Sequence, residues 1–130
     1  MTEPSGAGTS TRVVVADDHE TFRAGLIALL QTAPGVEVVG EAATGEAGLD
    51  VVRDAQPDVV LMDVNLPGID GVEAARRLRE RPSPPVVLLL STYDEDAGAQ
   101  FVAESGASAY VTKSSFGCDR LREAWAAASA

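Results

Sequence analysis

Short runs of apolar residues alternate along the chain with longer stretches in which apolar residues recur at helical spacing. The runs are rich in Val and Leu at successive positions, which is typical of strands buried on both faces of a parallel sheet. They predict strands at residues 12–16, 36–40, 58–62, 86–90 and 108–112. A helix is expected from about Asp94 to Ser105. The other stretches predict helices whose inward faces carry Phe22 and Leu26, Ala47 and Val51, Val72 and Leu78, and Leu121 and Trp125.

The ends of these predicted helices carry residues that commonly cap helices. Thr44 can accept a backbone hydrogen bond at the start of the second helix, and Asp70 with Glu73 resembles a capping box at the start of the third. Pro57 closes the second helix, and Gly106 can supply the left-handed conformation that ends the fourth. These local signals agree with the element order that the apolar pattern gives.

The alternation of strands and helices predicts both a topology and the place of a functional site. Strand–helix units in succession indicate an α/β fold in which helices cover both faces of a parallel sheet. Right-handed crossovers favour a doubly wound, flavodoxin-like sheet of five strands in the order 2-1-3-4-5. Ligands of such sheets bind beyond the carboxyl ends of the strands, at the switch point between strands 1 and 3.

Several polar residues come directly after the predicted strands and should meet at this edge. They are Asp17 and Asp18 after strand 1, Asp63 after strand 3, Ser91 and Thr92 after strand 4, and Thr112 and Lys113 at strand 5. Two carboxylates roughly 4 Å apart repel by about 4 kcal/mol at an effective dielectric of ~20. The three aspartates therefore need either a proton or a cation between them. An open site of oxygen ligands suits Mg²⁺.

Asp63 is the candidate nucleophile of this cluster. A carboxylate can attack phosphorus to form an acyl phosphate, and phosphoryl transfer depends mainly on positioning and charge neutralisation. Lys113 can balance the charge that remains once a cation is bound, and Ser91 can donate a hydrogen bond to a phosphoryl oxygen. The residues thus predict transfer of a phosphoryl group to Asp63.

The composition narrows the classes of function. The chain has 130 residues, 45% of them apolar, which fits one domain with its own core. Its net charge of −10 makes it a poor binder of nucleic acid or of an anionic membrane. No apolar run approaches the ~18 residues of a membrane span. The one cysteine, Cys118, excludes an internal disulfide and favours a reducing, cytoplasmic location. Residues 1–11 predict a disordered leader before a domain at residues 12–130.

Motifs around these strand ends resemble those of a known family. They are Val14-Val15-Ala16-Asp17-Asp18-His19, the run from Leu61 to Gly71, Leu90-Ser91-Thr92 and Tyr110-Val111-Thr112-Lys113. In this order they are similar to the receiver domains of bacterial two-component response regulators, and the resemblance covers roughly residues 12–128. The pair Asp17-Asp18 with His19, followed by the run from Phe22 to Leu26, looks most like the subfamily that carries a LuxR-type helix-turn-helix after the receiver.

The resemblance implies a phosphoacceptor and a metal site. Asp63 would accept the phosphoryl group from the phosphohistidine of a sensor histidine kinase, with Mg²⁺ as the cofactor. Asp17 and Asp18 would be the metal-side acids, one of them through water. The backbone carbonyl of Asn65 would complete the metal shell together with Asp63.

The resemblance also implies a switch. Ser91 would turn toward the phosphoryl group, Tyr110 would fill the space left, and Lys113 would pair with the phosphate. Many family members have a proline after this lysine, often with a cis bond, whereas this chain has Ser114. A cis bond before a residue other than proline costs about 2.5–4 kcal/mol, so we expect a trans bond and a somewhat different loop.

Other interpretations of single residues stay open at this point. Thr92 competes with Ser91 for the switch position, and Asp18 could act as an acidic residue at the start of the first helix. Tyr110 could be an ordinary half-buried aromatic of the sheet. The residues expected to be structural rather than functional are His19, Cys118 and Trp125.

Two rival functions remain beside the signalling switch. An aspartate-nucleophile phosphatase usually has a second aspartate two residues after the nucleophile, and here that residue is Asn65. We therefore expect that the protein is not an enzyme and that it catalyses at most its own phosphorylation and dephosphorylation. A receiver that is never phosphorylated and serves as an interaction module is the other alternative.

The output of the switch is the least determined part of the prediction. The subfamily resemblance predicts that the chain is the receiver part of a longer transcription factor, with a natural stand-alone receiver as the alternative. Self-association on phosphorylation is expected to produce a homodimer. It could use the first and last helices or the face of strand 5 with the helices beside it.

Overall fold

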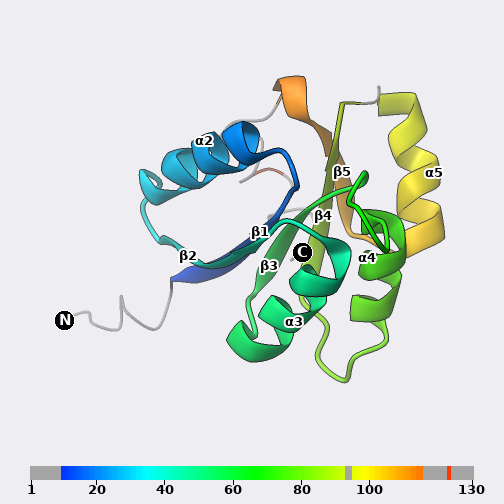
Figure 1. Cartoon of the computed structure of the whole chain (residues 1–130), viewed down its shortest axis with the longest axis horizontal. Helices are drawn as coiled ribbons and strands as arrows, with labels where there is room; N and C mark the ends of the chain where they lie inside the picture. Colours follow the sequence, from blue (N-terminus) through cyan, green and yellow to red (C-terminus); the bar gives the residue numbers. More distant parts are fainter. Residues whose placement is uncertain (1–9, 93–94, 116–122, 124–130) are drawn as a thin grey trace.

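The computed structural model describes residues 10–92, 95–115 and 123, which include one five-stranded sheet (Figure 1). The strands are β1 (Thr11–Ala16), β2 (Val36–Ala42), β3 (Val59–Asp63), β4 (Val86–Ser91) and β5 (Ala109–Thr112). They are arranged in the order β2-β1-β3-β4-β5, and every neighbouring pair is parallel. The predicted strand order is confirmed, and the carboxyl ends of all these strands lie at one edge.

A helix follows each of the first four strands. These helices are α2 (Glu20–Gln31), α3 (Gly45–Ala55), α4 (Gly71–Arg79) and α5 (Glu95–Ser105), and the short 3₁₀ helix η1 (Lys113–Ser115) follows β5. No helix in the described part of the chain has the length and apolar character that a bilayer crossing requires. The predictions for the last helix, with Leu121 and Trp125, and for Cys118 lie outside the described residues.

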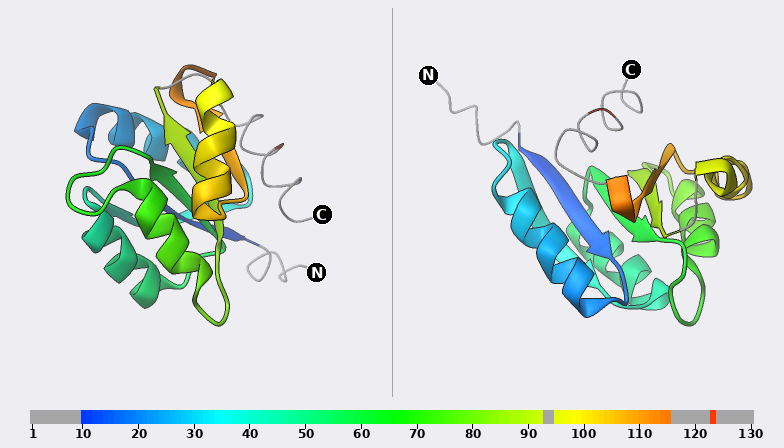
Figure 2. Two further views of the ribbon diagram at one scale, coloured as in Figure 1. Left: turned by 90° about the vertical axis from the view of Figure 1, so that its right-hand side faces the viewer. Right: turned by 90° about the horizontal axis from the view of Figure 1, so that it is seen from above.

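The side chains of the sheet alternate between two apolar layers. On one face, Val15 and Leu61 pack in a cluster with Leu26 of α2. On the other face, Met62 packs in a cluster with Leu78 of α4 and with residues of α3. Figure 2 shows α2 on one side of the sheet and α3 and α4 on the other. Helices therefore cover both faces, as the continuously apolar strands predicted.

The strand ends differ from the prediction by one or two residues. β2 continues to Ala42, because Glu41 pairs with Val15 of β1 and Ala42 pairs with Ala16. β2 is an edge strand, so it tolerates the exposed Glu41 that interrupts its apolar pattern. β3 and β4 include Asp63 and Ser91 as their last residues. Strand geometry therefore fixes the backbone of both residues.

The predicted caps form, with one exception. The side chain of Thr44 caps α3, and Asp70 Oδ1 accepts the Glu73 N–H at 2.8 Å at the start of α4. The Glu73 carboxylate does not complete a capping box, since it pairs with two exposed arginines of α4. Gly106, with φ +75°, ends α5 in the left-handed conformation as expected. No cis peptide bond occurs in the described residues, so the bond between Lys113 and Ser114 is trans.

Candidate functional site

An acidic cluster lies at the carboxyl edge of the sheet, where β1 and β3 end. One carboxylate oxygen from each of Asp17, Asp18 and Asp63 lies within 4.8 Å of the others. Asp17 is fully buried, Asp63 is only 4% exposed, and Asp18 is exposed. The structure thus brings together the three aspartates that the sequence placed at neighbouring strand ends.

Lys113 places a positive charge against this cluster. Its Nζ lies 2.7 Å from Asp17 Oδ2 and 3.3 Å from Asp63 Oδ2, and its side chain is 12% exposed. Only the contact with Asp63 has the geometry of a hydrogen bond. Asp17 Oδ2 is therefore buried beside a positive charge but accepts no hydrogen bond from the described residues.

Burial and neighbouring charges set the ionisation of Asp63 and Lys113. Burial raises the pKa of Asp63, the Asn65 N–H at 3.1 Å lowers it, Asp17 raises it and Lys113 lowers it, with a raised pKa as the net result. Burial lowers the pKa of Lys113, but Asp17 and Asp63 together outweigh burial and raise it. Lys113 therefore stays charged at neutral pH, and a second cation near Asp63 would favour its ionised, nucleophilic form.

The cluster fits a small divalent cation. Mg²⁺ binds oxygen ligands at about 2.1 Å, so two ligand oxygens are separated by at most about 4.2 Å, close to the 4.8 Å within which the three carboxylates lie. The buried Asp17 Oδ2, which pairs with Lys113 but accepts no hydrogen bond from the described residues, is an acceptor that such an ion would satisfy. The donor set consists only of carboxylates, which Mg²⁺ prefers to nitrogen or sulfur.

The turn that carries Asp17 and Asp18 is held by hydrogen bonds that the sequence did not reveal. Arg23 Nη1 donates to the Asp17 carbonyl at 2.7 Å, and Arg23 Nε donates to Glu41 at 2.8 Å. Asp17 Oδ1 accepts the His19 N–H at 2.7 Å. His19, not Asp18, is the N-cap of α2, and its side chain makes no capping hydrogen bond. These contacts tie the aspartate turn to α2 and to the end of β2.

Of the two residues of the predicted switch, Ser91 is the last residue of β4 and Tyr110 lies within β5. Ser91 is fully buried and immediately follows Leu90, which pairs with Asp63 across the sheet. Thr92 is exposed. Burial at the end of the strand next to Asp63 therefore favours Ser91 over Thr92 as the hydroxyl of the site. Tyr110 is half-buried and packs against the layer of the core that α3, α4 and α5 cover.

Two residues that sequence reasoning did not assign to the site touch it. The Phe22 ring lies under Lys113, with Nζ 4.5 Å from the ring centroid. Gly71 lies against Asp63, because a Cβ at position 71 would be 1.9 Å from the Asp63 carbonyl oxygen. A glycine at the first residue of a helix, where no positive φ requires it, is a signal for such close packing. Phe22 stood out only by its helical spacing and by its place in the run that resembles the subfamily, and neither pointed to a contact with Lys113.

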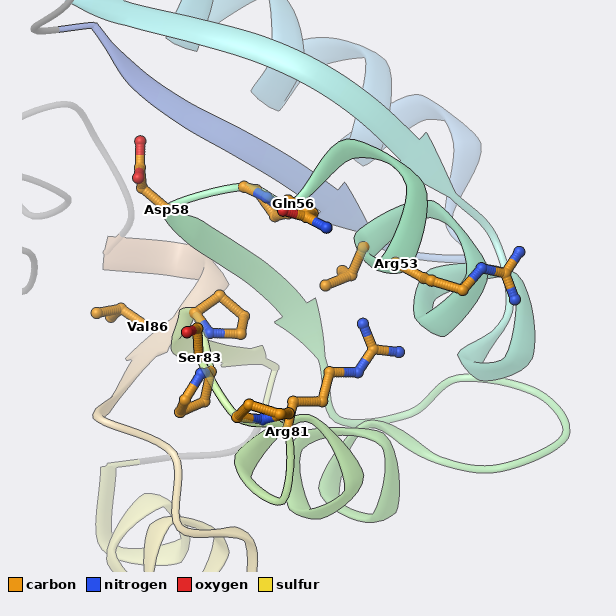
Figure 3. Close-up of a pocket in the computed structure, with 11 residues that line it drawn as sticks. Arg53, Gln56, Asp58, Arg81, Ser83 and Val86 are labelled. Carbon is orange, nitrogen blue, oxygen red and sulfur yellow. The ribbon is translucent and has the colours of Figure 1, made fainter.

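A cavity of about 590 Å³ lies elsewhere, between the end of α3 and residues 81–86 (Figure 3). It is at the amino ends of β3 and β4, opposite the acidic cluster. Figure 3 shows the Arg81 side chain reaching toward α3, where it donates to the Leu49 carbonyl at 3.2 Å. Arg53 pairs with Asp50 and Asp54. The cations of this cavity are thus engaged by the protein itself, and the cavity contains none of the predicted site residues.

A doubly wound sheet with an acidic cluster and a lysine at its carboxyl edge is typical of a class of signalling domain. The family model described as the response regulator receiver domain matches residues 13–126, and the chain belongs to this family. Receiver domains are generally signalling domains rather than enzymes, and they typically bind Mg²⁺ at an acidic pocket.

Individual relatives of the chain include transcriptional regulatory proteins. The chain is 41% identical to the probable transcriptional regulatory protein NarL of Mycobacterium tuberculosis, over 80% of this chain and 48% of that protein. It is 39% identical to the transcriptional regulatory protein LiaR of Bacillus subtilis, over 80% of this chain and 49% of LiaR. It therefore spans about half the length of these curated relatives.

Solved structures agree with the sequence relatives. The receiver domain of the putative response regulator NarL from Mycobacterium tuberculosis has a TM-score of 0.83 and 36% identity, and the match covers 92% of this chain and 97% of that one. A LuxR-family response regulator from Aurantimonas has a TM-score of 0.82 and 35% identity, with 92% and 86% covered. The predicted family and subfamily are confirmed.

Proposed function

We propose that this domain receives a phosphoryl group on Asp63 and transmits its phosphorylation state to an output domain. The observation that carries the proposal is the position of Asp63. Its carboxylate lies at the carboxyl end of a central strand, is almost fully buried, contacts Lys113 at 3.3 Å and shares a cluster with Asp17 and Asp18. A structural aspartate would not require two further carboxylates beside it, because they raise the cost of its charge.

Each group of the site has its own role in the transfer. An Asp63 oxygen attacks phosphorus, the new O–P bond forms as the P–N bond of a phosphohistidine breaks, and the leaving histidine nitrogen takes a proton. Lys113 meets the phosphoryl oxygens as a point charge, and the Asn65 N–H, which now donates to Asp63 Oδ1 at 3.1 Å, orients the carboxylate. Such positioned donors are the main contribution of a protein to phosphoryl transfer.

The residues that would hold Mg²⁺ are Asp17, Asp18, Asp63 and the backbone carbonyl of Asn65. When bound, the ion neutralises the carboxylates and the phosphoryl oxygens, which would otherwise repel each other. Asp17 provides a buried acceptor and Asp18 an exposed one. The phosphoryl donor is a sensor histidine kinase, and the aspartyl phosphate is lost again by self-catalysed hydrolysis.

The signal leaves the site through Ser91 and Tyr110. Ser91 turns to donate to the phosphoryl group, Tyr110 follows, and the face formed by α5 and β5 changes. A phosphoryl group can shift this equilibrium only through its different affinity for the two arrangements. In the whole protein we propose a receiver at residues 12–130 after a leader at residues 1–11, homodimerisation on phosphorylation, and a DNA-binding output of the LuxR type.

The proposal is tested by intact-mass measurement after incubation with acetyl phosphate and Mg²⁺. The wild-type protein is expected to gain the mass of one phosphoryl group, whereas Asp63→Asn gains none. Asp50→Asn, which changes an exposed aspartate of α3, is the matched control and should behave like wild type. Asp18→Asn, or chelation of Mg²⁺, should slow the gain strongly. An adduct that persists in Asp63→Asn overturns the assignment, and a wild-type protein that gains none supports the non-phosphorylated module.

The place of the Tyr110 ring depends on the absence of a side chain at position 98. A Cβ on Gly98 would lie 2.1–2.7 Å from three atoms of the Tyr110 ring. The ring centroid also lies 6.0 Å from that of Phe101, one turn further along α5. Gly98→Ala is therefore expected to displace the ring and to cost about 1–2 kcal/mol of unfolding free energy, since overpacking outweighs the ~1 kcal/mol gain in helix propensity.

The Gly98 prediction has an internal control. In a Tyr110→Ala background the obstructing ring is gone, so Gly98→Ala should stabilise the protein through helix propensity alone. Denaturant unfolding of the four proteins of this cycle measures the coupling. Equal effects of Gly98→Ala with and without the ring would contradict the packing described.

A further inference from the structure

Lys113 has a third neighbour besides its two carboxylates. Its Nζ lies 4.5 Å from the centroid of the Phe22 ring, within the range of a cation–π contact. Phe22 comes from the first turns of α2, directly after the aspartate turn, while Lys113 follows β5. The ring itself is half-buried against the core layer under α2 and is held there by packing.

Lysine needs such a contact more than most residues of the site. Its ammonium stands on a flexible stem with four rotatable bonds, whereas Asp17 and Asp63 are fixed at strand ends. A carboxylate in place of the ring would also anchor the ammonium, but it would add negative charge to a site that already holds three aspartates. An aromatic face attracts the ammonium and leaves its full charge available to an incoming phosphoryl group.

We propose that Phe22 is a positioning residue for the phosphoryl transfer. The face of its ring holds the Lys113 ammonium beside the Asp63 carboxylate. The inference rests on the proposed phosphorylation of Asp63 and adds a residue of α2 to the machinery. α2 would then contribute to the reaction through the Phe22 ring, while the turn before α2 contributes Asp17 and Asp18.

The test replaces Phe22 with phenylalanines that carry one, two or three ring fluorines. Fluorine withdraws electron density from the face of the ring and changes the size of the ring little. Packing is therefore kept while the cation–π attraction falls with each fluorine. We expect the logarithm of the rate of phosphorylation by acetyl phosphate with Mg²⁺ to fall linearly along the series. The total loss should be about five- to thirty-fold, which corresponds to about 1–2 kcal/mol, the range between an exposed and a desolvated cation–π contact. Phe22→Leu should lose as much as the most fluorinated ring, and Phe22→Tyr should keep the rate.

The same fluorinated series at Phe101 is the matched control. Phe101 is also half-buried, but its aromatic neighbour is Tyr110 rather than Lys113, so its series should leave the phosphorylation rate unchanged. The unfolding midpoint of every variant separates packing from positioning. If Phe22 were merely structural, its substitution would change the unfolding midpoint, and the phosphorylation rate would not depend on the number of ring fluorines. A phosphorylated wild type with a flat Phe22 series overturns this inference alone. A wild type that takes no phosphoryl group overturns the proposed function first.

Discussion

Gly71→Ala is expected to lower the free energy of unfolding by about 3 kcal/mol and to displace Asp63. A Cβ at position 71 would lie 1.9 Å from the Asp63 carbonyl oxygen, 2.8 Å from its carbonyl carbon and 2.9 Å from Val64 Cα. These are backbone atoms at a buried strand end, and the Gly71 N–H also donates to the Val64 carbonyl at 2.9 Å. Neither side can give way by a rotamer change, so the cost belongs at the upper end of the range for overpacking.

Gly25→Ala is the control for this substitution. Gly25 is an exposed residue inside α2, and nothing lies within 4 Å of the Cβ it would gain. The same chemical change should therefore stabilise the protein by about 1 kcal/mol through helix propensity. Denaturant unfolding compares the two variants, and the phosphorylation rate of Gly71→Ala reports the displacement of Asp63. If Gly71→Ala is as stable as wild type, α4 does not press against Asp63 as described.

Lys113→Met should lose about 3 kcal/mol of stability at neutral pH, and most of the phosphorylation rate. Removing the ammonium leaves Asp17 and Asp63 buried side by side without a positive charge, and breaking a buried pair in this way typically costs about 3–5 kcal/mol. We place the value at the lower end because the Lys113 side chain is 12% exposed. Arg77→Met removes an exposed partner of Glu73 and should change stability by less than about 0.5 kcal/mol.

The sign of the pH dependence follows from Asp63. Its pKa is already raised by burial, and Lys113 is one of the groups that lower it. Asp63 has a higher pKa in the folded protein than a carboxyl group of the unfolded chain. Such a group destabilises the fold when the pH rises above its unfolded pKa, and it has no such effect at lower pH. The stability deficit of Lys113→Met should therefore shrink from pH 7 toward pH 4, and Mg²⁺ should reduce it at pH 7. A deficit that is constant with pH would mean that packing, and not charge, accounts for the loss.

The sequence was sufficient for the sheet and for the positions of the acidic residues, for a simple physical reason. β3 and β4 each end in a polar residue, β1 is followed directly by one, and parallel strands bring their carboxyl ends to one edge. Asp17, Asp63 and Ser91 are placed by this rule alone. Boundaries were less predictable where an edge strand tolerates a polar residue, as β2 does at Glu41.

Contacts that depend on loop angles and rotamers could not be predicted. Phe22 lies far from Lys113 along the chain, and its helical spacing is equally consistent with plain core packing. Arg23 reaches both the Asp17 carbonyl and Glu41, a choice among many possible partners for an arginine. The capping motif at Asp70 formed only one of its two bonds because nearby arginines compete for Glu73.

The location of the phosphoryl group tests whether Asp63 is the phosphoacceptor. After reaction with acetyl phosphate and Mg²⁺, sodium borodeuteride reduces an aspartyl phosphate to deuterated homoserine, and peptide mass spectrometry locates the reduced residue. We predict deuterated homoserine at position 63 and at no other aspartate. Label at position 17 or 18, or a phosphorylated protein with no label at position 63, would show that Asp63 is not the phosphoacceptor.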